Sequence, residues 1–330
     1  MPDPYKSIHL IRHELEARGF TATKIVENGH SYFVFTKNDL RWQSRTAYVD
    51  YPFVPLAIKN LSTRKDQAYA YVANHGVAIA KTFSYTTPDE VAWDKVKAVT
   101  PLIVKPVDSD GSQGLTRNVT TEEALLTGVK NALLISTHAL VQQQFFGDEL
   151  RFTCMNGRVM SALLRMPATL KGDGEHTVEP LLSAATAARP QLNEHLPYIQ
   201  YPQLQANLVL QNLRQDEIVA KDVTIQIGES TMISGGAYVY DVLTEVDPTY
   251  IDVIEGLVQS LDARFLVVDF LIADRTVPAK PDNYIFLEFN TAPALKLYYS
   301  IRDGEQFDIV PLLSDLIVEQ LKGVSVTIAK

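Results

Sequence analysis

The sequence between residues 102 and 114 reads LIVKPVDSDGSQG. Its apolar start predicts a strand that ends at Lys105 and Pro106. The polar run that follows has two glycines and two serines, which let backbone amides converge on an anion. A lysine at a strand end is a compact charge suited to phosphate oxygens. The stretch therefore indicates a phosphate site, for which the candidates are Lys105, Ser109, Gly111, Ser112 and Gly114. The alternative is a solvated lysine before an ordinary hairpin turn.

Oxygen donors gather on two apolar segments near the C-terminal end. Glu288 and Asn290 are two residues apart in a predicted strand, so their side chains point to the same face. Asp269 lies within the apolar run of residues 265–273. A carboxylate on an apolar strand is costly unless it is paired or binds a metal. Magnesium takes hard oxygen ligands together with substrate phosphates, so these three residues are the candidate metal ligands.

A third candidate segment, residues 141–149, reads VQQQFFGDE. A strand that breaks at a glycine offers backbone groups to the edge of a purine, and a carboxylate beyond the break can accept a ribose hydroxyl. The alternative is any strand with a bulge. Glu149 is the candidate for the ribose contact.

Composition narrows the class of protein. The 330 residues can bury a large core and suggest two or more lobes. Lys+Arg 30 against Asp+Glu 39 gives a net charge of −9, which argues against nucleic acid as a partner. Cys154, the single cysteine, fits a reducing compartment and a buried strand thiol. The sequence has neither a signal pattern nor an apolar run long enough for a bilayer, so we expect a cytoplasmic protein without a membrane partner.

Local patterns predict α+β structure throughout. The first 55 residues read as a helix with Ile8, Ile11 and Leu15 on one face, followed by strands at 23–26, 31–36 and 41–49. A helix is predicted from residues 62–63 to Gly76, and another from the capping signal TPDE at 87–90. Later helices are expected near residues 121–129, 249–261 and 311–321, and strands at 139–143, 150–155, 159–165, 265–273 and 284–289.

Read in order, these segments resemble the ATP-grasp superfamily over roughly residues 55–310. Within it the chain is most similar to the ligase module of cyanophycin synthetases and of bifunctional glutathione-synthesising enzymes. The resemblance rests on five signatures in the family's order: residues 102–114, GDELR at 147–151, RMPA at 165–168 with GDG at 172–174, SGG at 234–236 followed by Asp241, and EFNTAP at 288–293.

The resemblance implies two α+β lobes that clamp ATP, with a small N-terminal α+β unit. The expected domains are residues 1–55, a small lobe at 56–138 with the glycine-rich phosphate loop, and a large lobe at 139–330 with the metal and substrate sites. Lys105 and Lys65 would contact the phosphates or adenine, and Gln142, Gln143 and Phe145 would meet adenine. Two magnesium ions, replaceable by manganese, would be bound at Asp269, Glu288 and Asn290.

The implied reaction joins a carboxylate to an amine, with amino acids or short peptides as substrates. ATP converts the carboxylate to an acyl phosphate, and the amine displaces the phosphate, so the enzyme is a carbon–nitrogen ligase. Arg165 would face the transferred phosphoryl group, as a catalytic residue beside Lys105. The substrate pocket is expected to use Arg151, Ser234, Gly235, Gly236, Asp241, Lys296 and Arg302. For residues 230–241, the alternative to a substrate-binding role is a flexible loop beside the cleft.

Two positions depart from the family pattern. Gln142 stands where many relatives have a glutamate that faces the adenine amino group, and its amide oxygen can still accept that hydrogen bond. Val267 stands where D-alanine ligases have an arginine, which favours a different acid–amine pair and leaves Arg165 as the substitute cation.

Three functions remain open at this point: the ligase, a small-molecule kinase without an amine step, and a nucleotide-binding regulatory protein. The full metal set argues against the last. We also expect no domain beyond the ligase module, and a homodimer, although the sequence leaves the oligomeric state and the two substrates open.

Overall fold

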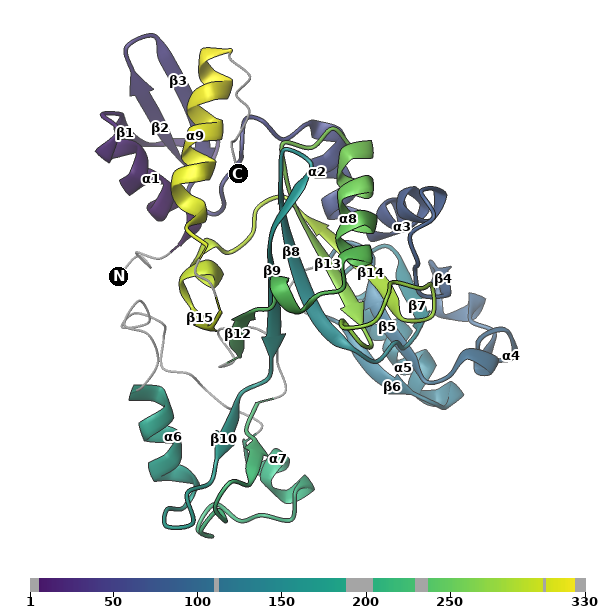
Figure 1. Cartoon of the computed structure of the whole chain (residues 1–330). Helices are drawn as coiled ribbons and strands as arrows, with labels where there is room; N and C mark the ends of the chain where they lie inside the picture. Colours follow the sequence, from purple (N-terminus) through teal and green to yellow (C-terminus); the bar gives the residue numbers. More distant parts are fainter. Residues whose placement is uncertain (1–5, 110–112, 188–203, 229–236, 305–306, 324–330) are drawn as a thin grey trace. The chain divides into compact units, whose positions relative to one another are not determined.

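The computed structural model describes residues 6–109, 113–187, 204–228, 237–304 and 307–323 (Figure 1). These residues form two compact units, each built from separate stretches of the chain. The first unit contains residues 1–53, 163–243 and 292–330, and the second contains residues 54–162 and 244–291. Helices and strands alternate in both, so the predicted α+β class is confirmed.

The first unit begins with helix α1 (Ser7–Ala17), whose buried face is the predicted one of Ile8, Ile11 and Leu15. An antiparallel sheet follows, formed in the order β1-β2-β3 by Thr21–Glu27, His30–Lys37 and Leu40–Arg45. Asn28 and Gly29 both have positive φ in the first hairpin, as a tight two-residue turn requires. The third strand ends at Arg45, four residues before its predicted end.

Helix α9 (Ile309–Lys322) returns to pack against α1 and β3. The guanidinium of Arg18 donates to the carbonyl oxygen of Pro311 at 3.0 Å and pairs with Asp315. The same unit contains the 3-10 helix η6 (Leu295–Tyr299). A hydroxyl joins this segment to α1, because the Ser7 Oγ donates to the Pro293 carbonyl and accepts from the Leu295 amide, both at 3.0 Å.

Two smaller strand groups complete the first unit. Residues 163–166 of β9 (Arg158–Met166) pair antiparallel with β12 (Tyr238–Asp241), and β12 pairs parallel with β15 (Ile301–Asp303). Strands β10 (Thr169–Lys171) and β11 (Thr224–Gln226) form a separate ribbon. Helices α6 (Val178–Ala187) and α7 (Leu204–Leu210) lie with the ribbon, and Leu170, Val178 and Leu208 belong to its small core.

The second unit opens with two helices, α2 (Leu56–Thr63) and α3 (Lys65–Asn74). One helix was predicted to start at residues 62–63, but Arg64 has extended backbone angles and separates two helices there. A four-stranded sheet follows in the order β4-β7-β5-β6, formed by Thr82–Tyr85, Ala139–Gln143, Leu102–Pro106 and Thr116–Val119. Helix α5 (Glu122–Leu133) packs on this sheet, with the Thr121 side chain accepting from the Ala124 amide as its cap.

The helix predicted from residue 87 is wrong. The capping box at Thr87 and Glu90 is present, but it starts only the three-residue 3-10 helix η1 (Pro88–Glu90). Two further short turns follow, α4 (Trp93–Val96) and η2 (Lys97–Val99). Val91 is extended after η1, and it packs with Trp93 against the core of the four-stranded sheet. Packing Val91 and Trp93 against the core is therefore more favourable than continuing the helix.

The remaining strands of the second unit form an antiparallel group that carries the three candidate metal ligands. Strand β13 (Phe265–Ile272) pairs with β14 (Tyr284–Asn290) on one side and with β8 (Asp148–Met155) on the other. Strand β9 is the next neighbour of β8, and helix α8 (Pro248–Ser260) accompanies this group. A further 3-10 helix, η5 (Leu243–Glu245), precedes α8. Cys154 is fully buried on β8, as predicted, and burial raises the pKa of its thiol.

Among the residues that the structure describes, no helix is long and apolar enough to cross a bilayer.

Candidate functional site

Lys105 lies on β5 and points its ammonium at helix α3. The Nζ atom donates to the hydroxyl of Tyr69 at 2.8 Å and lies 5.4 Å from the centre of its ring. Removal from water lowers the pKa of Lys105 from 10.5 to about 8, against the opposing effect of the Glu288 charge. A desolvated ammonium held in this way is prepared to meet an anion.

Lys65 connects the candidate phosphate loop with a candidate metal ligand. Its Nζ atom donates to the Ser109 carbonyl oxygen at 2.6 Å and lies 3.7 Å from the Glu288 Oε2. Its backbone amide donates to the Val107 carbonyl at 3.2 Å. The Lys65 side chain is 15% exposed and that of Glu288 is 38% exposed, so the pair borders solvent. Lys65, Ser109 and Glu288 therefore lie close together, although 223 positions separate Lys65 from Glu288 in the sequence.

The glycine-rich loop is described at its two ends. The Ser109 hydroxyl donates to the Gln113 carbonyl at 3.2 Å. Gly114 has a φ of +69°, and a Cβ there would lie 2.7 Å from the Ile135 Cδ1 and 2.9 Å from the Pro106 Cγ. Only glycine satisfies both the backbone angle and the packing, so this glycine has a structural role. The candidates Gly111 and Ser112 lie outside the described residues.

The candidate adenine segment is β7 and the chain that follows it. The Gln142 side chain is buried, with Nε2 donating to the Thr82 hydroxyl at 2.7 Å, while Gln143 is exposed. Phe145 is partly exposed. At Gly147 a Cβ would lie 2.5 Å from the Ile272 carbonyl oxygen, so glycine allows the backbone to reach β13. Glu149 follows on β8, opposite Leu271.

The candidate metal ligands occupy neighbouring positions of one strand pair. Asp269 on β13 lies directly opposite Glu288 on β14, and Asn290 lies opposite Val267. Directly opposed residues of an antiparallel pair share a face, and residues two apart do so as well. Asp269, Glu288 and Asn290 therefore share one face of the strand pair, as the alternation predicts.

Arg151 and Asp269 form a buried ion pair on that face. The guanidinium Nε and Nη2 atoms donate to the two carboxylate oxygens of Asp269 at 2.8 and 2.6 Å. Asp269 is 1% exposed and Arg151 is 5% exposed. Arg151 was predicted to contact substrate, and the contact observed is with a candidate metal ligand. The register of β8 against β13 sets these two residues opposite each other.

The donor set fits a magnesium ion in chemistry. Glu288 and Asn290 are partly exposed and offer hard oxygen atoms, and Glu288 lies beside Lys65. Both oxygens of Asp269 accept a hydrogen bond from Arg151. In the described part of the chain, no group of three or more His, Cys, Asp or Glu side chains is placed to hold a metal ion.

Arg165, the catalytic candidate, and the substrate candidates Asp241, Lys296 and Arg302 lie in the first unit. Arg165 on β9 is opposite Val239, and Asp241 ends β12 with its Oδ1 accepting from the Leu243 amide at 3.0 Å. Arg302 belongs to β15, the next strand. Lys296 lines a cavity of about 220 Å³ together with Lys6 and Tyr48. Ser234, Gly235 and Gly236 lie outside the described residues.

Tyr69 is the residue that the motifs did not identify. Besides accepting from Lys105, its hydroxyl donates to the Leu287 carbonyl at 3.1 Å, next to Glu288. Burial raises the pKa of Tyr69, and the positive charge of Lys65 and a hydrogen bond from Gln142 oppose that rise. The available signal was spacing, because Tyr69 follows Lys65 by four residues and shares its helix face.

Comparison with known proteins gives two groups of relatives. No family model matches the chain. Its sequence is 24% identical over 325 residues to the glutathione biosynthesis bifunctional protein GshAB of Listeria innocua, covering 95% of this chain and 41% of that protein. The homologue from Listeria welshimeri is 27% identical over 224 residues, covering 66% and 29%. The chain therefore spans less than half the length of these relatives.

Solved structures agree on the fold. A bifunctional glutathione synthetase from Pasteurella multocida matches with a TM-score of 0.67 at 19% identity, covering 96% of this chain and 44% of that one. A D-alanine–D-alanine ligase from Bacillus anthracis matches with a TM-score of 0.52 at 11% identity, covering 82% and 70%. Both are ATP-grasp ligases, and the arrangement of helices and strands described above is the ATP-grasp fold.

Proposed function

We propose that this chain, which has the ATP-grasp fold, is an ATP-dependent ligase that joins a carboxylate to an amine. Its proposed substrates are amino acids or short peptides, and its products are an amide or peptide bond, ADP and phosphate. The observation that supports this best is the cluster of Lys65, Lys105, Tyr69 and Glu288, which joins the candidate phosphate loop to the candidate metal strand.

The two lysines would hold the triphosphate. Lys105 supplies a partly desolvated ammonium, and Lys65 supplies a second charge whose position is fixed by the Ser109 carbonyl. Phosphoryl transfer depends mainly on positioning and on charge stabilisation, so fixed cations are the groups that this chemistry needs. Gln142 and Gln143 on β7 would border the adenine, and Glu149 would accept a ribose hydroxyl.

Asp269, Glu288 and Asn290 would hold up to two magnesium ions, or manganese in their place. When bound, the metal neutralises phosphate charge during transfer. Arg151 orients the Asp269 carboxylate by donating to both of its oxygens. Lys65 balances part of the Glu288 charge before ATP arrives.

The reaction would proceed in two steps. A carboxylate oxygen of the first substrate attacks the γ-phosphorus, the bond to the bridging oxygen breaks, and ADP leaves. The amine nitrogen of the second substrate then attacks the acyl carbon, the carbon–oxygen bond to phosphate breaks, and phosphate leaves while the nitrogen loses a proton. Arg165 would face the transferred phosphoryl group. Candidate side chains for holding the two substrates are those of Asp241, Lys296 and Arg302.

The test is phosphate release from ATP and magnesium with a panel of carboxylate and amine substrates, followed by mass spectrometry of the products. A ligase releases phosphate only when both substrates are present, and the product mass equals their sum less one water. A kinase releases ADP with the acid alone and leaves a phosphorylated product. Glu288→Ala is expected to abolish turnover. The proposal is contradicted if no substrate pair in the panel increases phosphate release and if Glu288→Ala binds magnesium ATP as tightly as the parent does.

A further inference from the structure

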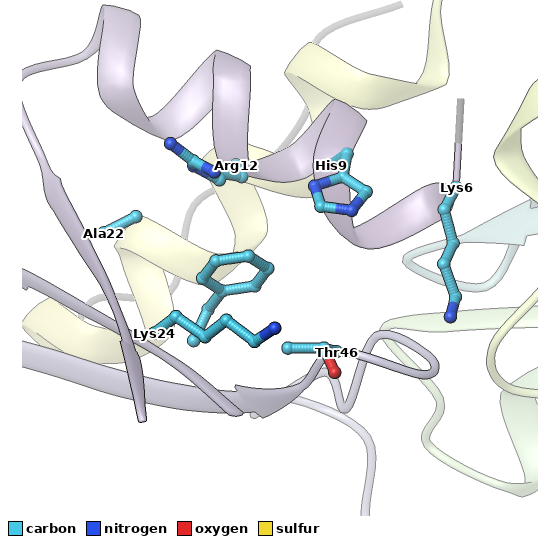
Figure 2. Close-up of a pocket in the computed structure, with 7 residues that line it drawn as sticks. Lys6, His9, Arg12, Ala22, Lys24 and Thr46 are labelled. Carbon is cyan, nitrogen blue, oxygen red and sulfur yellow. The ribbon is translucent and has the colours of Figure 1, made fainter. Parts of the chain in front are cut away.

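The first unit contains a basic pocket between helix α1 and its sheet. The pocket has a volume of about 570 Å³, and four of its lining side chains are Lys6, His9, Arg12 and Lys24. Figure 2 shows His9 and Arg12 on the helix and Lys24 and Thr46 on the opposite wall, with Lys6 at one end. The volume lies within the range of about 300–1,000 Å³ that is usual for small-molecule sites.

The charge of this pocket is unbalanced. Its lining contains three permanent cations and one histidine, and no aspartate or glutamate. Arg12 has a partner, because its Nε donates to the Glu16 Oε1 at 2.8 Å. Neither Lys6 nor Lys24 has an ion-pair partner within the described parts of the chain. In a protein of net charge −9, cations gathered in a concave site repel one another, and a bound anion relieves that repulsion.

An aromatic ring contacts two of the lining side chains, those of Arg12 and His9. Phe33 on β2 is 4% exposed and lines the pocket. The Arg12 guanidinium lies 5.2 Å from the centre of this ring, and the His9 ring meets it edge-on at 5.7 Å. A cation held over an aromatic face loses less conformational freedom when it binds a ligand. The helix side of the pocket is therefore ordered before any ligand arrives.

Lys6, at the start of α1, does not stabilise this helix. Lys6 is the N-cap residue of α1 and makes no capping hydrogen bond, and the first turn has no acidic residue. A helix N-terminus is the positive end of the helix dipole, so a cation there is unfavourable. Lys6 adds its charge to that of the dipole at the edge of the pocket.

We propose that this pocket binds a small polyanion that carries two or more carboxylate or phosphate groups. The cations of two elements, α1 with its N-cap and β1, would meet the anionic groups from opposite sides, while the ligand's body would lie against Phe33. The proposal does not depend on the ligase reaction, because none of these side chains belongs to the candidate ATP and metal residues.

Isothermal titration of the full chain tests this, with citrate and pyrophosphate as separate probes at low ionic strength. Both Lys6 and Lys24 are exposed, so Lys6→Gln and Lys24→Gln are expected to fold normally. Each variant should weaken binding by about tenfold, since one charge-assisted hydrogen bond is lost. Lys130→Gln, at an exposed site on α5, is the matched control and should bind as the parent does. The stronger probe identifies the carboxylate or the phosphate class.

Pyrophosphate could also occupy the candidate triphosphate site, and Lys105→Met separates the two. Binding in this pocket should be about tenfold weaker in Lys24→Gln and unchanged in Lys105→Met. Three results would overturn the proposal: the opposite pattern in these two variants, no binding to the parent, or equal affinity in Lys6→Gln, Lys24→Gln and the parent. None of them affects the proposed ligase function.

Discussion

The Lys105 ammonium donates to the Tyr69 hydroxyl at 2.8 Å and lies over the same ring. The tyrosine in turn donates to the Leu287 carbonyl, one residue before Glu288. One hydroxyl thus joins the lysine of β5, helix α3 and the strand with the candidate metal ligands.

Replacing Tyr69 with phenylalanine keeps the ring and removes the hydroxyl. The buried ammonium loses its acceptor and the Leu287 carbonyl loses its donor, so we expect the free energy of unfolding to fall by about 1–3 kcal/mol. Urea denaturation measures this change. Tyr71→Phe, on the same helix with its exposed hydroxyl bonded to Ser260, is the control, and its effect should stay within about 0.5 kcal/mol. Equal stability of the two variants would show that the Tyr69 hydroxyl contributes nothing.

The pKa of Lys105 near 8 predicts that ATP affinity depends on pH. Bound phosphate raises that pKa, so binding takes up a proton above pH 8, and affinity falls by up to about tenfold per pH unit there. Titration of magnesium ATP between pH 7 and 9 measures the slope. In Lys105→Arg the cation stays charged across this range, so the slope attributed to residue 105 should disappear. A parent protein whose affinity is flat with pH contradicts this assignment.

The buried pair of Arg151 and Asp269 predicts a large loss when one partner is neutralised. Asp269→Asn removes the negative charge that faces the buried guanidinium of Arg151 and should cost about 3–5 kcal/mol of unfolding free energy. Asp216→Asn breaks the exposed pair with Arg214 and should cost at most about 1 kcal/mol.

A double variant separates charge from packing at the same pair. Replacing both partners with apolar residues, as in Arg151→Met with Asp269→Leu, should restore most of the stability while magnesium-dependent ATP binding stays lost. If Asp269→Asn is no more harmful than Asp216→Asn, the ion pair has no role in stability.

Gly114 and Gly29 offer a matched comparison of backbone and packing effects. Both have positive φ, but a Cβ at Gly29 meets nothing within 4 Å whereas one at Gly114 would meet Ile135 and Pro106. Gly29→Ala should cost about 1–2 kcal/mol from the backbone alone. Gly114→Ala should cost about 1–3 kcal/mol more because it overpacks the loop end. Thermal denaturation compares the two, and equal costs would remove the packing argument.

Short-range signals predicted most elements of this fold. The strand at 139–143 and the helix capped by Thr121 have the expected positions because alternation and capping act over a few residues. The capping box at Thr87 was misleading, since a cap favours the first turn and says nothing about the residues beyond it. There, burial of Val91 and Trp93 determined the outcome. The break at Arg64 likewise had no local glycine or proline to indicate it.

In the candidate site, too, relationships between residues near in sequence could be predicted, and those between distant residues could not. Glu288 and Asn290 could be predicted to share a face because residues two apart on a strand always do. The Arg151–Asp269 pair depends on the register between β8 and β13, which no single segment encodes. The contacts of Tyr69 could not be predicted from its helix alone, because its partners Lys105 and Leu287 are distant in sequence.

The single cysteine has a further use. Cys154 lies fully buried on β8, beside the strand that bears Asp269, and its thiol has a raised pKa. A thiol reagent therefore reacts only when this strand opens, since the reactive thiolate is absent from the folded protein. The natural sequence thus contains its own reporter of strand opening, and the rate of labelling with and without magnesium ATP measures how strongly a ligand holds the strands together.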